Sequence, residues 1–144
     1  MKADHEELAI RWLRQAKSDL EDPGYLFEGS RYHLACFISQ QASEKALKAY
    51  LYAQGAGAVW GHSASELCAD ASRSDKGFLE LKHLAALLDT FYIPTRYPDA
   101  LPEGIPADMF AETDAEKAIK ASTRIVGFVK DRISPSSSAN SSWV

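Results

Sequence analysis

The sequence predicts an all-α fold, an antiparallel up-and-down bundle of four long helices plus one short helix. No convincing run alternates apolar and polar residues, as a half-buried strand would. Apolar residues instead recur at spacings of three and four along several segments. The stretch 31–51 adds about twenty residues without Gly or Pro, most of them strong helix formers. At 144 residues the chain is long enough for one domain with a real core.

The first helix is expected to start near Asp4, whose carboxylate can cap a helix. The sequence Asp22-Pro23-Gly24 is expected to kink or end this helix, because proline lacks the N–H that an interior helical position needs. Residues 25–27 would then form a further turn. The apolar stripe of the helix consists of Leu8, Trp12, Leu13, Ala16 and Leu20.

The second helix is expected to run from a cap at Ser30 to Gly55. Small residues recur along it at spacings of three and four and form one ridge, where another helix can approach closely. This ridge, together with more apolar helix faces than one small bundle can cover, predicts a homodimer. The ridge residues are Ala35, Ser39, Ala42, Ala46 and Ala49.

The remaining segments predict one short helix, two longer ones and an irregular loop. Ser63 is expected to cap the short helix 63–71, and the next helix covers 78–91. Residues 93–109 hold four of the six prolines and are therefore expected to form a loop. Thr113 or Asp114 opens the last helix, which ends around 134–135. We expect a bundle over 1–134 and a mobile Ser-rich tail over 135–144 that includes Trp143.

Composition narrows the classes of function. The net charge of -4 argues against binding nucleic acid through bulk charge, although it leaves room for a local basic cleft. The apolar runs are too short to cross a membrane, and the N-terminus lacks the apolar stretch of a secretion signal, so a cytoplasmic protein is expected. Cys36 and Cys68 have no metal-ligand spacing and are expected to be buried thiols. No metal or cofactor is predicted.

The segment 32–51 resembles a motif of the HEPN domain family, the higher eukaryote and prokaryote nucleotide-binding domains. It contains an aromatic residue, then small residues, then Gln40-Gln41-Ala-Ser-Glu44-Lys45-Ala-Leu-Lys48. The resemblance covers roughly residues 6 to 133, and four further pieces follow the family order. They are Ala16-Lys-Ser-Asp-Leu20, Gly61-His-Ser63, Arg96-Tyr-Pro-Asp99 and a final helix opening near Asp114-Ala115.

The resemblance implies a helical domain that forms a symmetric dimer and binds a nucleotide, RNA or a partner protein. Short bacterial members of the family are often paired with a minimal nucleotidyltransferase, frequently as a toxin–antitoxin pair. Many members are metal-independent ribonucleases that use an Arg followed, after four to six residues, by a His. Here Arg73 and His83 have nine residues between them, Arg31 and His33 are too close, and the last helix has no His. The nuclease motif is therefore not carried over.

Five residues form the candidate ligand site: Gln41, Lys45, Lys48, His62 and Arg96. The two lysines supply point charges from a rigid helix, and arginine offers a forked contact to phosphate. A negatively charged protein must concentrate positive groups locally to hold a phosphate. If there is a ligand, we expect it to be anionic and to lie where the second helix faces the 93–109 loop.

A structural role remains open for each of these residues. Gln41, Lys45 and Lys48 would then lie on a solvated helix face, where Glu44 and Lys48 have the four-residue spacing of a helical ion pair. His62 would then bridge its loop to the second helix, and Arg96 would tie the long loop to acidic residues of the bundle.

Three functions follow. The first is a homodimeric binding module for a nucleotide, RNA or a nucleotidyltransferase partner. The second is a non-standard ribonuclease, or a subunit that assists nucleotidyl transfer. The third is a pure dimerisation element. The missing Arg and His spacing favours the first function over the second.

Overall fold

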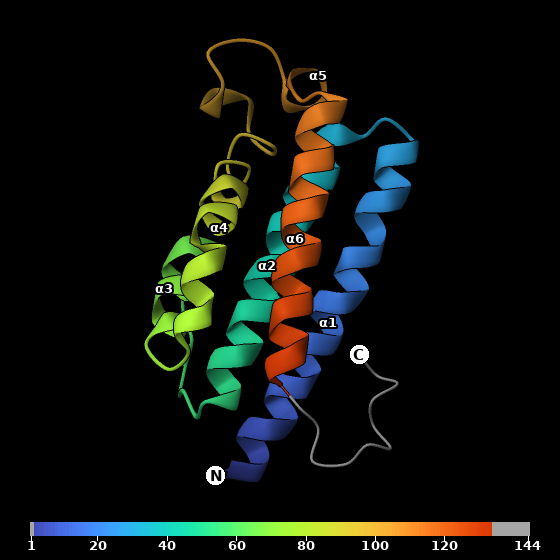
Figure 1. Cartoon of the computed structure of the whole chain (residues 1–144). Coiled ribbons are helices and arrows are strands. Elements are labelled where there is room, and N and C mark those ends of the chain that lie inside the picture. Colours follow the sequence, from blue (N-terminus) through green and yellow to red (C-terminus); the bar gives the residue numbers. More distant parts are fainter. Residues whose placement is uncertain (1, 134–144) are drawn as a thin grey trace.

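The computed structural model describes residues 2–133, and within them the fold is all-α, as predicted (Figure 1). Of the three long helices, α1 runs antiparallel to both α2 and α6, which run side by side in the same direction, and two shorter helices lie along α2. Short helical turns complete the described part of the chain. The α-helices are α1 (Lys2–Glu28), α2 (Tyr32–Ala53), α3 (Ala64–Ser72), α4 (Lys82–Asp89), α5 (Pro106–Met109) and α6 (Glu112–Arg132), and the 3-10 turns are η1 (Lys76–Leu81) and η2 (Pro98–Ala100).

Helix α1 continues through Pro23, so of the two alternatives for Asp22-Pro23-Gly24, a kink or an end, the end is wrong. Proline removes the N–H that would bond the carbonyl of Asp19. Its ring is fully buried, and Leu26 in the following turn packs against the core. Burial of this last turn offsets the lost hydrogen bond. The helix also begins at Lys2, which places Asp4 in the first turn rather than at the cap.

Ser30 does not cap α2, contrary to the prediction. Its φ of 60° is left-handed, and the residue closes the end of α1. The N–H of Arg31 donates to the Leu26 carbonyl at 2.8 Å, and the N–H of Ser30 to that of Phe27 at 3.0 Å. These bonds satisfy carbonyls that a helix end leaves free. Arg31 occupies the N-cap position of α2 without a side-chain cap bond.

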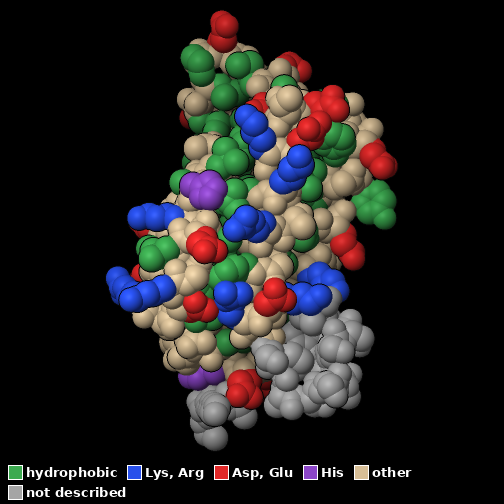
Figure 2. Space-filling model, in the orientation of Figure 1, with side chains coloured by type: hydrophobic (Ala, Val, Ile, Leu, Met, Phe, Trp, Pro, Cys, Tyr) green, Lys and Arg blue, Asp and Glu red, His purple; other side chains and the backbone are tan. Residues whose placement is uncertain are grey.

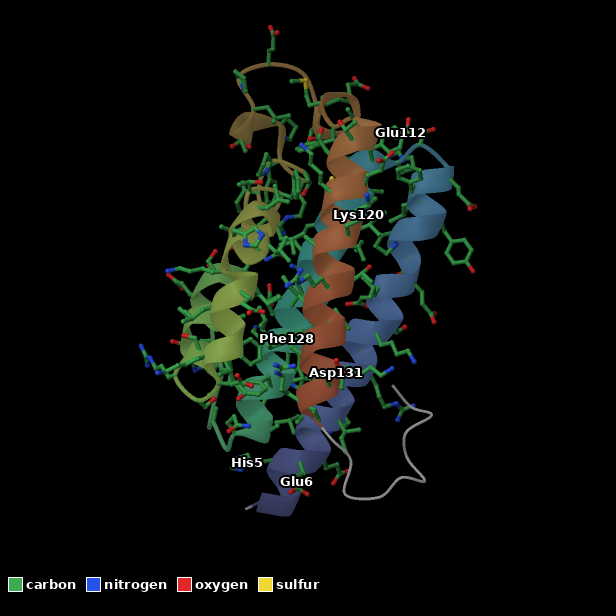
Figure 3. The ribbon with its side chains drawn as sticks, in the orientation of Figure 1. His5, Glu6, Glu112, Lys120, Phe128 and Asp131 are labelled. Carbon is green, nitrogen blue, oxygen red and sulfur yellow. The ribbon has the colours of Figure 1, made fainter. Side chains whose placement is uncertain are left out.

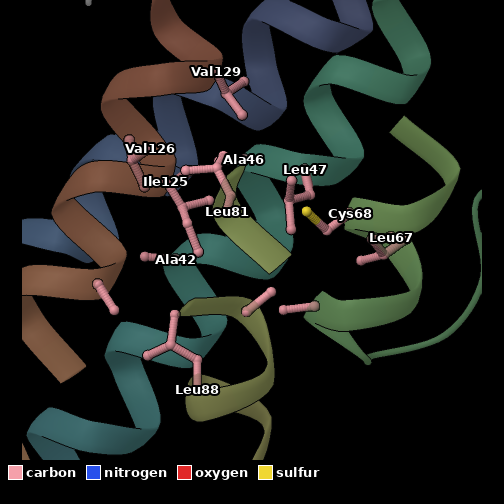
Figure 4. Packing of buried hydrophobic residues seen from close by; sticks show 14 of the residues in the cluster. Ala42, Ala46, Leu47, Leu67, Cys68, Leu81, Leu88, Ile125, Val126 and Val129 are labelled. Atoms are coloured by element: carbon pink, nitrogen blue, oxygen red, sulfur yellow. The ribbon is translucent and has the colours of Figure 1, made fainter. Parts of the chain in front are cut away.

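The small-residue ridge of α2 faces the inside of the bundle. Its members are fully buried, and Ala42 and Ala46 lie opposite Ile125 and Val126 of α6 (Figure 4). The Ser43 hydroxyl, on the same side, donates to Ser122 Oγ at 2.8 Å. The ridge therefore admits a helix of the same chain, and the inference of a dimer from it was wrong. The homodimer itself stays a prediction.

The cap of α3 is confirmed, because Ser63 Oγ accepts the N–H of Glu66. The single helix predicted over 78–91 is divided into η1 and α4. Asp75 accepts the N–H of Gly77 at 2.8 Å and starts a 3-10 turn. Residues three apart lie on one line in a 3-10 helix. Phe78 and Leu81 therefore both reach the core, where they are fully buried.

The proline-rich loop is irregular, as expected, apart from two short turns. Pro98 opens η2 and Pro106 opens α5, positions where the missing N–H costs nothing. The last helix begins at Glu112, one or two residues before the predicted start at Thr113 or Asp114, and the Asp114 carboxylate accepts the N–H of Ala111 at 2.9 Å. The predicted tail over 135–144, with Trp143, lies outside the described residues.

The core lies where α2, α3, α4 and α6 meet (Figure 4). Cys36 and Cys68 are buried in it as free thiols. Burial, with a smaller contribution from Asp114, raises the pKa of the Cys36 thiol to about 12. A thiol that stays protonated at neutral pH is unreactive. Within residues 2–133, no helix is long and apolar enough to span a bilayer, and no cluster of His, Cys, Asp and Glu has the arrangement of a metal site.

Candidate functional site

One face of α2 is left partly open by the bundle. Phe37, Gln41 and Lys45 recur every four residues and are each half-buried, so they share this face. Lys45 reaches Asp19 of α1 on one side. On the other side, Phe37 touches Tyr92, which follows α4. The open face is thus bordered by α1 and by the segments that carry His62 and Arg96.

Glu44 is the centre of this face, although its carboxylate is buried. Lys48 Nζ lies 3.1 Å from Glu44 Oε2, and His62 Nδ1 lies 3.2 Å from both carboxylate oxygens. Gln41 Nε2 donates to Glu44 Oε1 at 3.4 Å. Three of the five predicted ligand residues, Gln41, Lys48 and His62, therefore meet at one carboxylate.

Lys48 is paired inside the fold. Its side chain is only 7% exposed, against 5% for Glu44. Its ammonium lies 5.5 Å from the centroid of the Trp12 ring, which in turn stacks on Tyr52 with centroids 5.9 Å apart. The carboxylate and the ring compensate the buried charge. The expected Glu44–Lys48 pair is thus present, as a buried pair and not a solvated one.

Lys45 points to a different carboxylate. Its Nζ lies 2.5 Å from Asp19 Oδ2, and Gln15 Nε2 donates to Asp19 Oδ1 at 2.7 Å. The Lys45 side chain keeps 27% of its surface exposed. The two lysines therefore have separate partners, and of the two Lys45 has the accessible ammonium.

His62 is held in place at both its backbone and its ring. The buried Gln40 donates through Nε2 to the His62 carbonyl at 2.8 Å. The ring stacks on Tyr92, with centroids 5.4 Å apart and planes 17° apart. Since a carboxylate only accepts, the neutral ring carries its proton on Nδ1 toward Glu44. Nε2 then keeps its lone pair on a side chain that is 60% exposed.

Arg96 lies flat among aromatic rings. Its Nε donates to the Tyr92 carbonyl at 2.9 Å. Its guanidinium carbon lies 4.4 Å from the Tyr92 centroid, 4.8 Å from that of Tyr97 and 4.9 Å from that of Phe37. No carboxylate within residues 2–133 pairs with it. Arg96 is therefore held by aromatic rings and one backbone carbonyl, and not by acidic residues of the bundle, as one alternative expected.

A hollow of about 220 Å³ lies beside these groups, lined by His62, Ser63, Asp89, Tyr92 and Ile93. Asp89 accepts the N–H groups of Ala64 at 2.7 Å and Ser65 at 2.9 Å, and the Ser63 hydroxyl at 2.8 Å. Sequence reasoning missed Asp89 and Tyr92. Asp89 ends α4 and Tyr92 follows it, and no spacing in the sequence links either residue to the motif of α2. Gln40 was missed too, although it stands within that motif.

The face formed by α6 and α4 is different. It mixes basic and acidic side chains without a concentration of either (Figure 2). Lys120 lies there on α6 (Figure 3), and Arg124, one turn later, is also exposed. These two residues provide matched positions for comparing charge changes with those on the open face of α2.

Comparisons with known proteins agree with this architecture. The HEPN domain model matches residues 9–132. Among solved structures, TT1696 from Thermus thermophilus is 39% identical, with a TM-score of 0.81 over 86% of this chain and 97% of that one. ST0689, described as an archaeal HEPN homologue, is 39% identical, with a TM-score of 0.73 over 88% and 98%. An HEPN domain protein from Thermotoga maritima, tm0613, is 34% identical, with a TM-score of 0.67 over 85% and 97%. No curated protein matches.

Proposed function

The chain belongs to the HEPN domain family, and on that premise we propose that it is a binding module for a phosphate-bearing ligand, a nucleotide or single-stranded RNA. The observation that carries the proposal is the Arg96 guanidinium. It is fixed among three aromatic rings, and none of the described carboxylates neutralises it. A planar fork of donors held in this way suits a phosphate.

His62 supports the same assignment from the neighbouring segment. Its exposed ring stacks on the Tyr92 ring that also contacts Arg96. An imidazole can donate to a phosphate oxygen from Nε2 when protonated, or stack on a base. Backbone and ring contacts already hold it in place, so little ordering cost would remain on binding.

The other three predicted residues contribute in different ways. Lys45 offers an accessible ammonium, which a phosphate would share with Asp19. Gln41 is half-buried beside Glu44 and offers an amide. Lys48 is covered, so we propose that it acts by holding Glu44, and through Glu44 the ring of His62.

Arg96→Ala is expected to weaken binding of adenosine monophosphate by about tenfold or more, because a hydrogen bond to a charged group contributes about 1.5–3 kcal/mol. Isothermal titration calorimetry measures the change. Arg124→Ala removes the same charge from exposed α6 and should leave the affinity as it is. Equal affinity for Arg96→Ala and the unchanged protein would contradict the proposed site.

The lysines need separate treatment in this experiment. Lys48→Ala alone or with Lys45→Ala would leave Glu44 buried without its cation, so a loss of binding could follow from misfolding. Lys45→Ala is the cleaner probe. It should weaken nucleotide binding, and the remaining affinity should depend less on salt. Absence of any binding by the unchanged protein would favour the pure dimerisation element.

The isolated protein is expected not to cleave single-stranded RNA, because no Arg and His stand at the family spacing. Incubation of labelled RNA with and without chelator, followed by gel electrophoresis, measures this. Metal-independent cleavage abolished by His62→Ala would reverse the conclusion. It would favour the non-standard ribonuclease, with His62 as acid or base.

We also propose a homodimer, now through a surface other than the buried ridge. A hollow of about 360 Å³ between α1 and α2 is lined by Asp22, Tyr25, Leu26, Leu34 and Ile38, and Tyr25 is 77% exposed. Light scattering at micromolar concentration should give twice the 15.9 kDa monomer mass. Tyr25→Asp should reduce it to the monomer, because a charge in an apolar interface is costly. A monomer before any substitution would contradict this proposal.

A minimal nucleotidyltransferase is the partner that the family resemblance suggests, in a toxin–antitoxin-like pair. Because the nuclease spacing is missing, we propose that this chain would act as the binding subunit within such a pair. Co-purification with a nucleotidyltransferase encoded beside it would support the partnership.

A further inference from the structure

A hollow of about 310 Å³ lies between α1 and α6, outside the candidate site. None of its lining residues lines the hollow beside His62 or the one beside Tyr25. It therefore belongs neither to the proposed phosphate site nor to the proposed dimer surface. The lining residues are Gly24, Phe27 and Glu28 of α1 and Glu116, Ile119 and Lys120 of α6.

The described chain does not fill this hollow. Helices α1 and α6 each pack mainly against α2 and less against each other. Gly24 stands inside α1, and a Cβ atom placed on it would meet no atom of another segment within 4 Å. Glycine is a poor helix former, and its use inside a helix is to let another group approach the backbone closely. No segment of residues 2–133 makes that approach at Gly24, so the space is available to another molecule.

The inner wall of the hollow is apolar and its rim is charged. Phe27 and Ile119 are half-buried, and Phe27 packs against the core and makes an edge contact with Tyr32. Glu28 and Glu116 are exposed. Figure 2 shows hydrophobic side chains between the upper part of α6 and α1, with acidic side chains beside them. The hollow therefore offers burial to an apolar side chain and two carboxylates to cations next to it.

Charge is distributed unevenly along the chain. The stretches 18–30 and 97–116 hold ten of the 20 Asp and Glu side chains and none of the 16 Lys and Arg side chains. The rest of the chain therefore has a formal net charge of +6. The antiparallel packing of α1 and α6 brings the two acidic stretches together at one end of the bundle, where both contribute to the hollow (Figure 1).

Most of these ten carboxylates are free to meet a partner. Asp19 is bonded by Lys45, and Asp114 caps α6. The other eight are exposed, and none of them forms an ion pair with a residue of the described chain. Lys120 is the one cation among the lining residues, and it does not pair with Glu116 one turn before it.

We propose that this hollow is the docking site for a basic amphipathic helix of a partner protein. A large apolar side chain of that helix enters the hollow against Phe27 and Ile119. Lysines or arginines on either side of it face Glu28 and Glu116. A helix suits the shape, because the groove between two packed helices accepts the apolar residues that recur every three or four positions on a third.

The charge of the site selects the partner. Complementary charges speed association and disfavour partners of the wrong sign. RNA and nucleotides are such partners here, because their phosphates would meet the carboxylates at this end of the bundle. The inference therefore stands apart from the proposed phosphate site at Arg96.

Fluorescence anisotropy of a labelled synthetic peptide tests the proposal. The probe has about 18 residues, or five helical turns, with leucines every three or four positions and lysines elsewhere. One comparison peptide carries glutamates in place of the lysines, and another has the same residues in scrambled order. The Leu–Lys peptide should bind, with an affinity that falls as salt rises from about 50 mM to about 300 mM. The comparison peptides should bind about tenfold more weakly, since each lacks either the charge or the apolar stripe.

Gly24→Leu fills the hollow from α1 and should weaken binding of the Leu–Lys peptide about tenfold. The added side chain enters free space and leucine favours a helix, so the bundle should stay folded, which circular dichroism checks. Gly57→Leu is the matched control. Gly57 also has nothing near its Cβ position, but it lies in the loop between α2 and α3, so the affinity should not change.

Charge substitutions give a second readout. Glu28→Gln combined with Glu116→Gln should weaken binding about threefold to tenfold and reduce its salt dependence. Lys120→Gln should instead strengthen binding about twofold, because it removes a cation that repels the peptide. Glu6→Gln combined with Glu7→Gln removes two exposed carboxylates near the other end of α1 and should have little effect.

Unchanged affinity in either Gly24→Leu or the Glu28 and Glu116 double variant would overturn the docking site. An equal loss in the Glu6 and Glu7 double variant would indicate binding through bulk charge and would overturn it as well. Equal binding of a comparison peptide, or no binding of the Leu–Lys peptide by the unchanged protein, would overturn the basic helical partner. Mononucleotide binding should be the same in all of these variants, so the phosphate site and the docking site can fail independently.

Discussion

Asp89→Ala is expected to lower the free energy of unfolding by about 3–5 kcal/mol, one of the two largest effects that we expect from a single substitution. The Asp89 carboxylate accepts two backbone N–H groups and one hydroxyl at the start of α3. Each donor left unsatisfied in a partly buried place costs about 1–3 kcal/mol. Water can reach some of them, so the loss stays below the full sum. Urea unfolding followed by circular dichroism measures the change.

Two variants serve as controls. Asp89→Asn keeps one acceptor oxygen and should lose roughly half as much stability. The negative charge disappears, together with the hydrogen bonds that the second carboxylate oxygen accepts. Asp70→Ala removes a carboxylate from the exposed side of α3, where the distance between Asp70 Oδ1 and Arg73 Nη2 is 3.7 Å. A surface pair of this kind contributes little. A similar loss in Asp70→Ala and Asp89→Ala would contradict the capping role of Asp89.

Asp89→Ala should also affect the candidate site. Gln40 Nε2 donates to Asp89 Oδ1 at 3.3 Å and to the His62 carbonyl at 2.8 Å. Without the carboxylate, this amide loses one of the acceptors that orient it. We expect the segment around His62 to become more mobile, so Asp89 links the packing of α3 and α4 to the position of the imidazole.

The helices could be predicted because their signals are local. Apolar spacing along 31–51 and 114–133 depends only on neighbouring residues, and Ser63 caps α3 through a residue three positions away. The exceptions have tertiary causes. Pro23 stays helical because its turn is buried, and Ser30 is used by the preceding helix rather than by the following one.

The ridge shows a different limit. Spacing indicated correctly that a helix approaches closely along Ala42 and Ala46, but not which helix it is. The partner is α6, about 80 positions away in the chain, as Ser43 and Ser122 illustrate. A pattern on one helix carries no information on whether its partner belongs to the same chain.

The proximity of three of the candidate residues was predictable from the sequence, whereas their geometry was not, and that they bind a ligand stays a prediction. The motif order brought Gln41, Lys48 and His62 into one group, and the structure places them together. What they share is Glu44, which sequence reasoning treated as one half of a surface pair. Its contact with His62, and the contact of its partner Lys48 with Trp12, join segments that the spacing within α2 does not mark.

Glu44→Ala is the second substitution with a large expected effect, about 3–5 kcal/mol in the free energy of unfolding. Removal of one member of a buried ion pair leaves the other charge without compensation. Here Lys48, with 7% of its side chain exposed, would keep only the Trp12 ring. The His62 ring would lose its acceptor at the same time. Urea unfolding measures the loss, and nitrogen NMR shifts of the imidazole report whether the proton stays on Nδ1.

The double variant Glu44→Gln with Lys48→Met separates charge from packing. It removes both buried charges and keeps the side-chain volumes similar, so it should recover much of the stability lost in either single variant. Additive losses in the double variant would mean that the two charges do not compensate each other. Comparing Glu44→Gln with Glu44→Ala tests separately whether Glu44 positions His62 for ligand binding. The Gln side chain retains an acceptor oxygen for His62 Nδ1, whereas Ala does not. If the Glu44→Ala protein kept the imidazole proton on Nδ1 and bound mononucleotide unchanged, Glu44 would stabilise the bundle without positioning the ligand site.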